Sequence, residues 1–203
     1  MVLGITGGIA SGKSYVTAIF KEFGIPVVSA DDLARAVVEP GRPTLQALRQ
    51  RFGEAIITAH GELDRARLAE IIFADPAARR DLNQIIHPAI ATLAELTLQQ
   101  LKDAGKRLIV YEAPLLFEAG AEDRVDAVLM VSIDPELQRR RLARRDGLDD
   151  AAVTARVAAQ LPQEEKVARA DYVIDNSGSR AKTRAQVSAL YHQLTVTCQL
   201  PGD

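Results

Sequence analysis

Eight consecutive residues near the amino terminus fit the phosphate-binding pattern G-x-x-x-x-G-K-[S/T]: Gly7, Gly8, Ile9, Ala10, Ser11, Gly12, Lys13 and Ser14. Glycines allow the tight turns that bring backbone N–H groups close to phosphate, and a following helix adds the partial positive charge of its N-terminus. The lysine supplies a charge for the terminal phosphates, and the serine hydroxyl supplies a ligand for Mg²⁺. A glycine-rich turn with a chance lysine is the alternative, but the full motif argues against it. The sequence therefore predicts a loop that binds a nucleoside triphosphate and continues to Tyr15, where many such loops have a second Ser or Thr.

Carboxylates follow two of the expected strands. Asp31 and Asp32 come just after a short strand at residues 26–29, and Glu112 ends a strand at residues 107–111. Asp31 has the chemistry to accept a proton from an attacking hydroxyl, but both aspartates would equally well cap the helix that follows. Glu112 is a candidate for holding Mg²⁺ through water, or a polar strand end beside solvent. Arg35 lies on the same helix face as Asp31, where it would hold a substrate phosphate or pair with one of the aspartates.

Five arginines crowd seven positions of a later helical segment: Arg139, Arg140, Arg141, Arg144 and Arg145. A solvated basic face, a nucleic-acid patch and a phosphate-closing lid are the three interpretations. The lid is favoured because Arg141 and Arg145, spaced i and i+4, face the same way, and closing over phosphate would exclude water. Asn176 and Gly178 follow the last strand, where they would contact an adenine edge or form a plain turn.

Apolar runs at residues 2–6, 26–29, 107–111, 126–133 and 172–174 predict strands, and helical patterns separate them. Such alternation predicts an α/β fold with a parallel sheet covered by helices on both faces, a three-layer P-loop NTPase fold with five strands. We expect one domain over residues 1–203, with a nucleotide-binding core of residues 1–30, 106–134 and 170–203. Residues 31–105, interrupted at Asp75-Pro76 and His87-Pro88, form the expected helical acceptor subdomain. Residues 135–169 form the expected lid.

Composition excludes several classes of function. The net charge of −2, the absence of tryptophan and the 4% aromatic content argue against nucleic-acid binding. No guanine-reading N-K-x-D is present, which argues against a GTPase. The start has no charged segment typical of a signal peptide, and no apolar run is long enough to span a membrane. A single cysteine, Cys198, excludes an internal disulfide. This suits a reducing cytoplasm, the expected location, although a secreted protein without disulfides would look the same.

An ordered set of segments resembles the dephospho-CoA kinase family over roughly residues 2–180. The set comprises the phosphate loop with residues 4–6, Ser29-Ala30-Asp31 with Ala34-Arg35, Leu82-Asn83 with Ile86-His87-Pro88, Pro114-Leu115-Leu116-Phe117-Glu118, Gln138 with Arg141, Arg145 and Asp146, Gln160 with Lys166 and Ala170-Asp171, and residues 174–178. The one departure is Ser29, where the family commonly has a first aspartate in Asp-Ala-Asp.

The resemblance implies transfer of the ATP γ-phosphoryl group to the ribose 3′-hydroxyl of dephospho-CoA. It implies Asp31 as the catalytic base, assisted by Lys13 and Arg141, with Arg145, Asn176 and Gly178 on the ATP side. Mg²⁺ is expected with ATP, and a monomer or weak homo-oligomer is the expected working form. The acceptor would contact five residues: Arg35, His87, Leu115, Leu116 and Glu118. Two alternatives remain from the residues alone: another P-loop kinase acting on a nucleoside or nucleotide, and a non-catalytic nucleotide-binding regulator.

Overall fold

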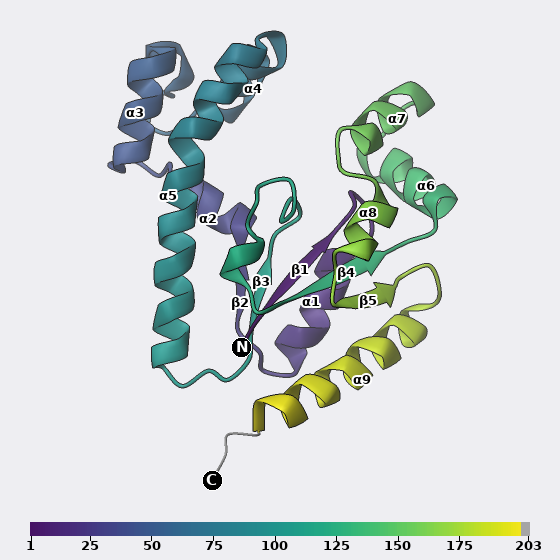
Figure 1. Cartoon of the computed structure of the whole chain (residues 1–203). Helices are drawn as coiled ribbons and strands as arrows, with labels where there is room; N and C mark the ends of the chain where they lie inside the picture. The colour runs from purple at the N-terminus through teal and green to yellow at the C-terminus, as the bar shows by residue number, and fades with distance from the viewer. Residues whose placement is uncertain (200–203) are drawn as a thin grey trace. The chain divides into compact units, whose positions relative to one another are not determined.

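The computed structural model describes residues 1–199, and the side chain of Cys198 lies outside what it describes. Over this range five strands form one parallel sheet in the order β2-β3-β1-β4-β5 (Figure 1). The strands are β1 (Val2–Gly7), β2 (Val27–Ser29), β3 (Ile109–Glu112), β4 (Ala127–Ser132) and β5 (Tyr172–Asp175). The predicted five-stranded parallel sheet is therefore confirmed, and each predicted strand is present to within two residues at either end.

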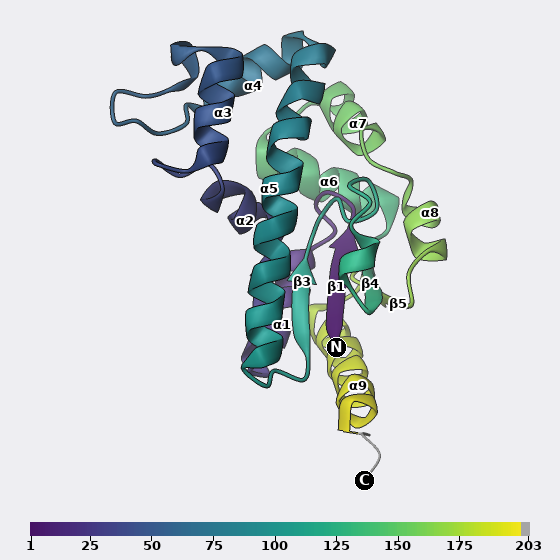
Figure 2. The same ribbon diagram turned by 60° about the vertical axis from the view of Figure 1, so that its left-hand side comes forward.

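The central strand β1 is buried along its whole length because it pairs with β3 on one side and β4 on the other. Its apolar side chains alternate between the two faces of the sheet. On one face, Leu3 and Ile5 pack in a core with helices α1 (Lys13–Glu22) and α9 (Arg180–Gln199). Figure 2 shows these two helices on the same side of the sheet.

The other face is covered in part by residues 113–125, which include the short helix η2 (Glu122–Arg124). A Cβ on Gly4 would lie 3.1 Å from Val125 and 3.2 Å from Leu116, so this segment packs tightly on the middle of β1. After β4, the predicted lid comprises α6 (Pro135–Asp146), α7 (Asp150–Ala158) and α8 (Gln163–Ala168). Asp134 and Asp149 cap α6 and α7 by accepting hydrogen bonds from backbone N–H groups.

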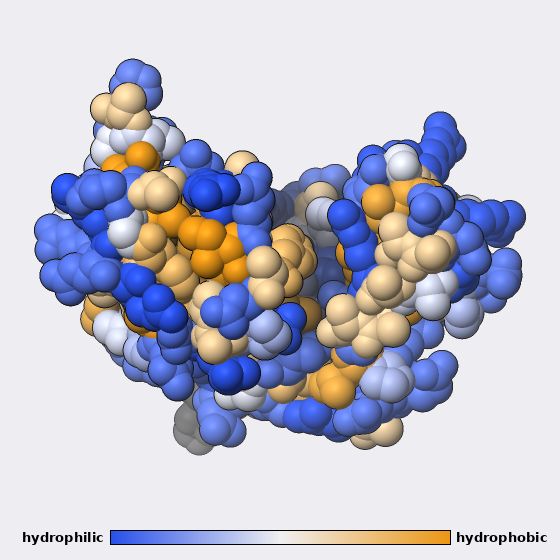
Figure 3. Space-filling view, turned by 90° about the horizontal axis from the view of Figure 1, so that it is seen from above, coloured by the Kyte–Doolittle hydropathy of each residue, from blue (hydrophilic) through white to orange (hydrophobic). Residues whose placement is uncertain are grey.

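Contacts divide the described chain into two compact units, one containing the sheet and the lid and the other spanning Ala30–Gln99. The second, helical unit contains α2 (Ala30–Ala36), α3 (Pro43–Phe52), η1 (Glu54–Ile56), α4 (Arg65–Ala74) and most of α5 (Pro76–Asp103). Its own core contains Leu48, Ile56 and Leu68. In the space-filling view from above, hydrophobic residues are also exposed on the part of the surface that this unit forms (Figure 3).

The two breaks expected in this helical region have different outcomes. The break at Asp75-Pro76 is confirmed, since α4 ends at Ala74 and Asp75 has the extended backbone favoured before proline. The break at His87-Pro88 is wrong, because α5 continues through Pro88. Proline removes one hydrogen bond of the helical ladder. Apolar side chains on both sides of Pro88, among them Ile86 and Ile90, pack on the unit's core and offset that loss.

Within the described residues, no helix combines the length and hydropathy required to cross a bilayer.

Candidate active site

The phosphate loop joins β1 to α1 at the carboxyl edge of the sheet, as the sequence predicts. A turn is closed by the hydrogen bond from Ser11 N–H to Gly8 C=O, 3.2 Å long. Ala10 has a φ of 59°, as the second central residue of a type II turn requires. Gly12, with a φ of 90°, then begins α1. The loop therefore leads directly into a helix N-terminus, whose N–H groups and dipole favour an anion.

The amine of Lys13 donates hydrogen bonds to the carbonyls of Gly7 and Gly8, each at 2.9 Å. Lys13 therefore lies over the loop that precedes its own helix, at the position from which a lysine reaches terminal phosphates. Ser14 is exposed in the first turn of α1. Glu112 ends β3, in register with Ile5 of β1 and Ser29 of β2.

Gly12 lies against two side chains from distant segments. A Cβ at this position would be 2.1 Å from Nδ2 of Asn176 and 3.8 Å from Nη1 of Arg141. Arg141 extends from α6 toward the phosphate loop, so the structure places a guanidinium beside the loop as the lid interpretation predicts. Guanidinium groups in such a position stabilise the charge of a transferring phosphoryl group.

Asn176 is buried and bonds within the protein. Its Nδ2 donates to the Ser11 carbonyl at 2.7 Å, and its Oδ1 accepts from the Thr183 hydroxyl at 2.9 Å. In this structure its amide therefore holds the phosphate loop. The nearby Gly178 lies against the side chain of Lys182.

Tyr15 of α1 is partly buried and packs against the core on the α1 face of the sheet. Its hydroxyl donates to the Arg180 carbonyl at 3.1 Å, and the Arg180 guanidinium lies 5.4 Å from the centre of its ring. The residue that departs from the usual Ser or Thr thus connects α1 to the start of α9.

Three other lid arginines, Arg139, Arg145 and Arg156, form ion pairs within the lid. Arg145 donates to both carboxylate oxygens of Asp146, and Arg156 pairs with the same carboxylate. These bonds lower the pKa of Asp146, and the bond from Arg145 has the largest effect. Arg139 joins α6 to α7 through Asp150, at 2.5 Å. Arg141 is thus the lid arginine for which the structure gives a position beside the phosphate loop.

An ion pair joins the loop after β3 to α8. Lys166 is fully buried, and its amine lies 2.5 Å from Oε1 of Glu118, whose side chain is 20% exposed. The same carboxylate oxygen accepts from Leu161 N–H. Burial would raise the pKa of Glu118, but the bond from Lys166 and the backbone N–H bonds outweigh it, so the pKa lies below its ordinary value. In the same loop Leu116 is fully buried in protein, whereas Leu115 is 48% exposed and presents the loop's apolar surface.

The predicted acceptor residues of the helical unit are exposed. Asp31 lies in the first turn of α2, two residues after β2 ends. Arg35 pairs with Asp32 at 3.1 Å, which is one of the two arrangements that the sequence left open. His87 lies in the middle of α5 rather than at a helix start, on an exposed face.

Sequence reasoning missed the direct role of two glutamines. Gln138 Nε2 donates to the Ile9 carbonyl and Gln160 Oε1 accepts from the Ile9 N–H, both at 2.8 Å. Gln138 is 8% exposed. The available signal was Gln138, a neutral residue directly before the five lid arginines. A buried polar side chain must find a hydrogen-bond partner, so an inward-facing glutamine there indicates a specific contact.

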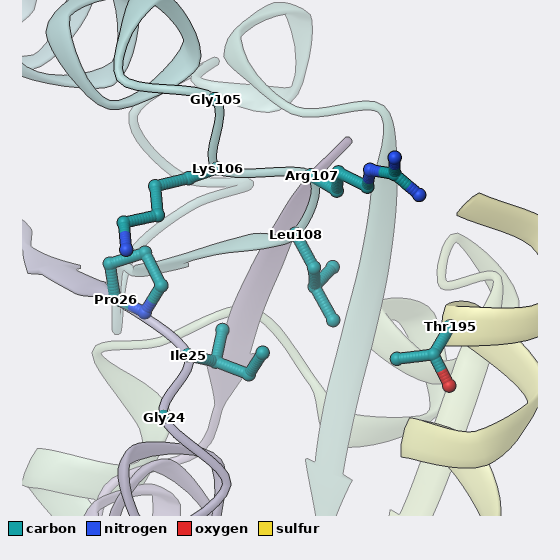
Figure 4. A pocket seen from close by; sticks show the side chains of 8 residues that line it. All are labelled: Gly24, Ile25, Pro26, Gly105, Lys106, Arg107, Leu108 and Thr195. Carbon is teal, nitrogen blue, oxygen red and sulfur yellow. The ribbon is translucent and has the colours of Figure 1, made fainter. Parts of the chain in front are cut away.

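A hollow of about 200 Å³ lies at the opposite edge of the sheet. Its lining comes from residues 24–26 and 105–108, which precede β2 and β3, and from Thr195 of α9. Figure 4 shows the charged end of Arg107 pointing away from Ile25 and Leu108. Because the hollow lies at the amino ends of the strands, it is separate from the phosphate loop.

Comparison with known proteins shows the family to which the chain belongs. The family model described as CoaE, dephospho-CoA kinase, matches residues 1–182. The chain belongs to the dephospho-CoA kinase family. The dephospho-CoA kinase of Syntrophotalea carbinolica is 55% identical over 194 residues, covering 96% of this chain and 92% of the relative. That of Geobacillus kaustophilus is 44% identical, covering 95% of this chain and 96% of the relative.

Solved structures extend the comparison to the fold. The dephospho-CoA kinase from Campylobacter jejuni superposes with a TM-score of 0.77 at 28% identity, covering 97% of this chain and 98% of that one. A shikimate kinase from Bacteroides thetaiotaomicron, 14% identical, has a TM-score of 0.53 over 96% of this chain and 98% of that one. At that identity the likeness shows a shared kinase fold alone. This member of the dephospho-CoA kinase family is therefore an ATP-dependent kinase with the P-loop fold.

Proposed function

We propose that this kinase transfers the γ-phosphoryl group of ATP to the ribose 3′-hydroxyl of dephospho-CoA, producing coenzyme A and ADP. The observation that carries the proposal is the site at the end of β1, where Lys13 and the start of α1 lie beside the Arg141 guanidinium. This arrangement presents backbone N–H groups, an ammonium and a guanidinium to a triphosphate. The activity for which the family is named, dephospho-CoA kinase, gives the acceptor.

In this proposal Asp31 orients the ribose 3′-hydroxyl and accepts its proton. The hydroxyl oxygen then forms a bond to the γ-phosphorus while the bond from that phosphorus to the β,γ-bridging oxygen breaks, and ADP leaves. Lys13 and Arg141 balance the charge on the phosphoryl oxygens during the transfer. Support for Asp31 is its place in the chain, two residues after β2, whose last residue is in register with Glu112.

We propose that ATP is bound together with Mg²⁺. Ser14 and Glu112 would hold the ion, Ser14 by its hydroxyl and Glu112 through water. Mg²⁺ keeps several waters and uses one or two protein oxygens plus phosphates, so this donor set fits. The ion would supply charge neutralisation at the phosphates. Among the described residues, no group of three or more His, Cys, Asp or Glu side chains is arranged to hold a metal ion.

The remaining predicted residues would bind the two substrates. Tyr15, Arg145, Asn176 and Gly178 would lie on the ATP side. On the acceptor side, the exposed Leu115 offers apolar contact, while Leu116 and Glu118 support the loop from within. Arg35 and His87 are the candidate contacts of the helical unit. A cytoplasmic location and a monomer or weak homo-oligomer complete the proposal.

The test is ADP production from ATP with different acceptors. Dephospho-CoA should stimulate it, and nucleosides or nucleoside monophosphates should not. Stimulation by the latter compounds alone would replace this proposal with a nucleoside or nucleotide kinase.

A further inference from the structure

Both backbone polar groups of Ile9 are bonded to side chains of the predicted lid region. Its N–H donates to Gln160 and its C=O accepts from Gln138, with both distances 2.8 Å. Gln138 lies in the first turn of α6, and Gln160 lies between α7 and α8. We call this pair of glutamines the Ile9 clamp.

The clamp acts on the strained part of the phosphate loop. Ile9 and Ala10 are the central residues of the turn closed by Ser11 and Gly8. Among the described residues Ala10 is the one non-glycine residue with a positive φ. Such a conformation persists only where its surroundings determine it. Two bonds to Ile9 fix the peptide groups on either side of that residue, and thereby the start of the phosphate-binding N–H series.

The absence of a side chain on Gly8 leaves room for the two glutamine amides to reach Ile9. A Cβ on Gly8 would lie 2.6 Å from Gln138 Nε2 and 3.9 Å from Gln160 Oε1. The φ of Gly8 is not among the positive values, so its backbone conformation does not by itself require glycine. Space for the glutamine amides is therefore the reason that the structure gives for a glycine at this position.

The second glutamine is itself held by the ion pair of Lys166 and Glu118. The residue after Gln160 is Leu161, whose N–H donates to Glu118 at 3.1 Å, and Glu118 pairs with the fully buried Lys166. Consecutive residues thus bond to the loop after β1 and the loop after β3. A fixed backbone at Leu161 limits how far the Gln160 side chain can move from Ile9.

We propose that Gln138 and Gln160 are positioning residues that hold the phosphate loop in its ATP-binding conformation and couple it to the lid. The proposal deepens the proposed function and rests on it for the identity of the nucleotide. It assigns neither glutamine a contact with substrate, since both act through the Ile9 peptide groups.

The first test is the affinity for MgATP in the absence of any acceptor. Gln138→Met and Gln160→Met keep side-chain length but remove one bond each, so each should weaken MgATP binding about tenfold. The KM for ATP should rise in parallel, while the KM for dephospho-CoA should stay within about twofold. Binding equal to that of the unmodified protein in both variants would overturn the proposal.

Glutamate substitutions make the test directional. In Gln160→Glu the carboxylate still accepts from Ile9 N–H, whereas in Gln138→Glu it would face the Ile9 carbonyl without a proton to donate. Both changes add the same charge beside the same turn, so their difference reports the direction of the bond. Gln138→Glu should bind MgATP about tenfold more weakly than Gln160→Glu. The reverse order would overturn the proposal.

A matched control separates positioning from general loosening of the sheet edge. Gln186 of α9 makes the same pair of bonds to one residue, accepting from Asp175 N–H at 3.0 Å and donating to its C=O at 2.9 Å. Gln186→Met should lower the melting temperature without changing MgATP affinity more than about twofold. A loss of affinity equal to that of the clamp variants would overturn the proposal.

Failure of dephospho-CoA turnover in the unmodified protein would contradict the acceptor assignment alone, because MgATP affinity is measured without an acceptor.

Discussion

The phosphate loop and the acceptor residues of the helical unit differ in how completely their groups are bonded. In the loop, the Lys13 amine, the Ser11 carbonyl and both backbone groups of Ile9 form hydrogen bonds within the protein. Gly12 lies directly against Asn176. In the helical unit, Asp31 and His87 are exposed side chains on helices. The difference follows from the chemistry. Backbone N–H groups bind phosphate well only if they are already oriented, whereas a carboxylate that accepts a proton must be reachable by the alcohol.

The largest expected effect tests the exposed side of this comparison. Asp31→Asn should lower kcat about a thousandfold, because the amide cannot accept the proton, and should leave MgATP affinity within about twofold. Steady-state turnover and a nucleotide titration measure the two quantities. Asp32→Asn is the matched control, since Asp32 already pairs with Arg35. A larger loss in that variant would make Asp32 the base.

The next effect concerns two arginines of one helix. Arg141→Ala should lower kcat about a hundredfold, as expected for loss of a group that stabilises transition-state charge. Arg139→Ala removes a pair with Asp150 and should change thermal stability but not kcat. Equal kcat values in the two variants would mean that the position of Arg141 beside Gly12 has no catalytic consequence.

A glycine pair sharpens the comparison between the two units. Gly12→Ala combines a positive φ with a contact of 2.1 Å to Asn176, and should weaken MgATP binding about thirtyfold. Gly41 has a φ of 84° but open space around it, so Gly41→Ala introduces strain without a clash. Its MgATP affinity should equal that of the unmodified protein. Similar losses in both would attribute the effect to backbone strain at any site.

The smallest effect is a pH dependence of stability. The folded state lowers the pKa of Glu118, so its contribution is present above the ordinary value of 4.5 and disappears as pH falls through the lowered folded value. At pH 7, Glu118→Gln should reduce the free energy of unfolding by about 1 to 2 kcal/mol, less than for a wholly buried pair because the carboxylate is partly exposed. Urea unfolding from pH 7 down to pH 3 should show the two proteins converging. A difference in the free energy of unfolding that stays constant with pH would contradict this account of the Lys166–Glu118 pair.

Local patterns were enough to predict the sheet and the phosphate loop. Apolar β-branched runs bounded by glycine or aspartate predicted all five strands. Parallel strands that are buried on both faces require nearly continuous apolar sequence, so such runs are easy to recognise. The continuous helix through Pro88 was not predictable in this way. A proline's local preference favours a break, and only the packing of residues on both sides of it overrides that preference.

The predicted site shows the same division. Lys13 and Gly12 follow from a motif with fixed spacing, and their geometry agrees with it. The contacts that hold the loop come from residues more than a hundred positions away, as for Gln138, Gln160 and Asn176. No spacing rule links such residues to Ile9 or Ser11, so only the tertiary structure could show that amide side chains hold the loop backbone.

Strands β2 and β3 are parallel neighbours in the sheet, and the helical unit lies between them in sequence. The whole stretch is therefore one crossover connection. It leaves the sheet after Ser29 at the end of β2 and returns before Ile109 at the start of β3. Every pairing of the sheet is formed by residues outside this stretch. Residues 32–99 contain no strand, so this one contiguous piece of chain can be exchanged toward a different alcohol while Asp31 and every strand are kept.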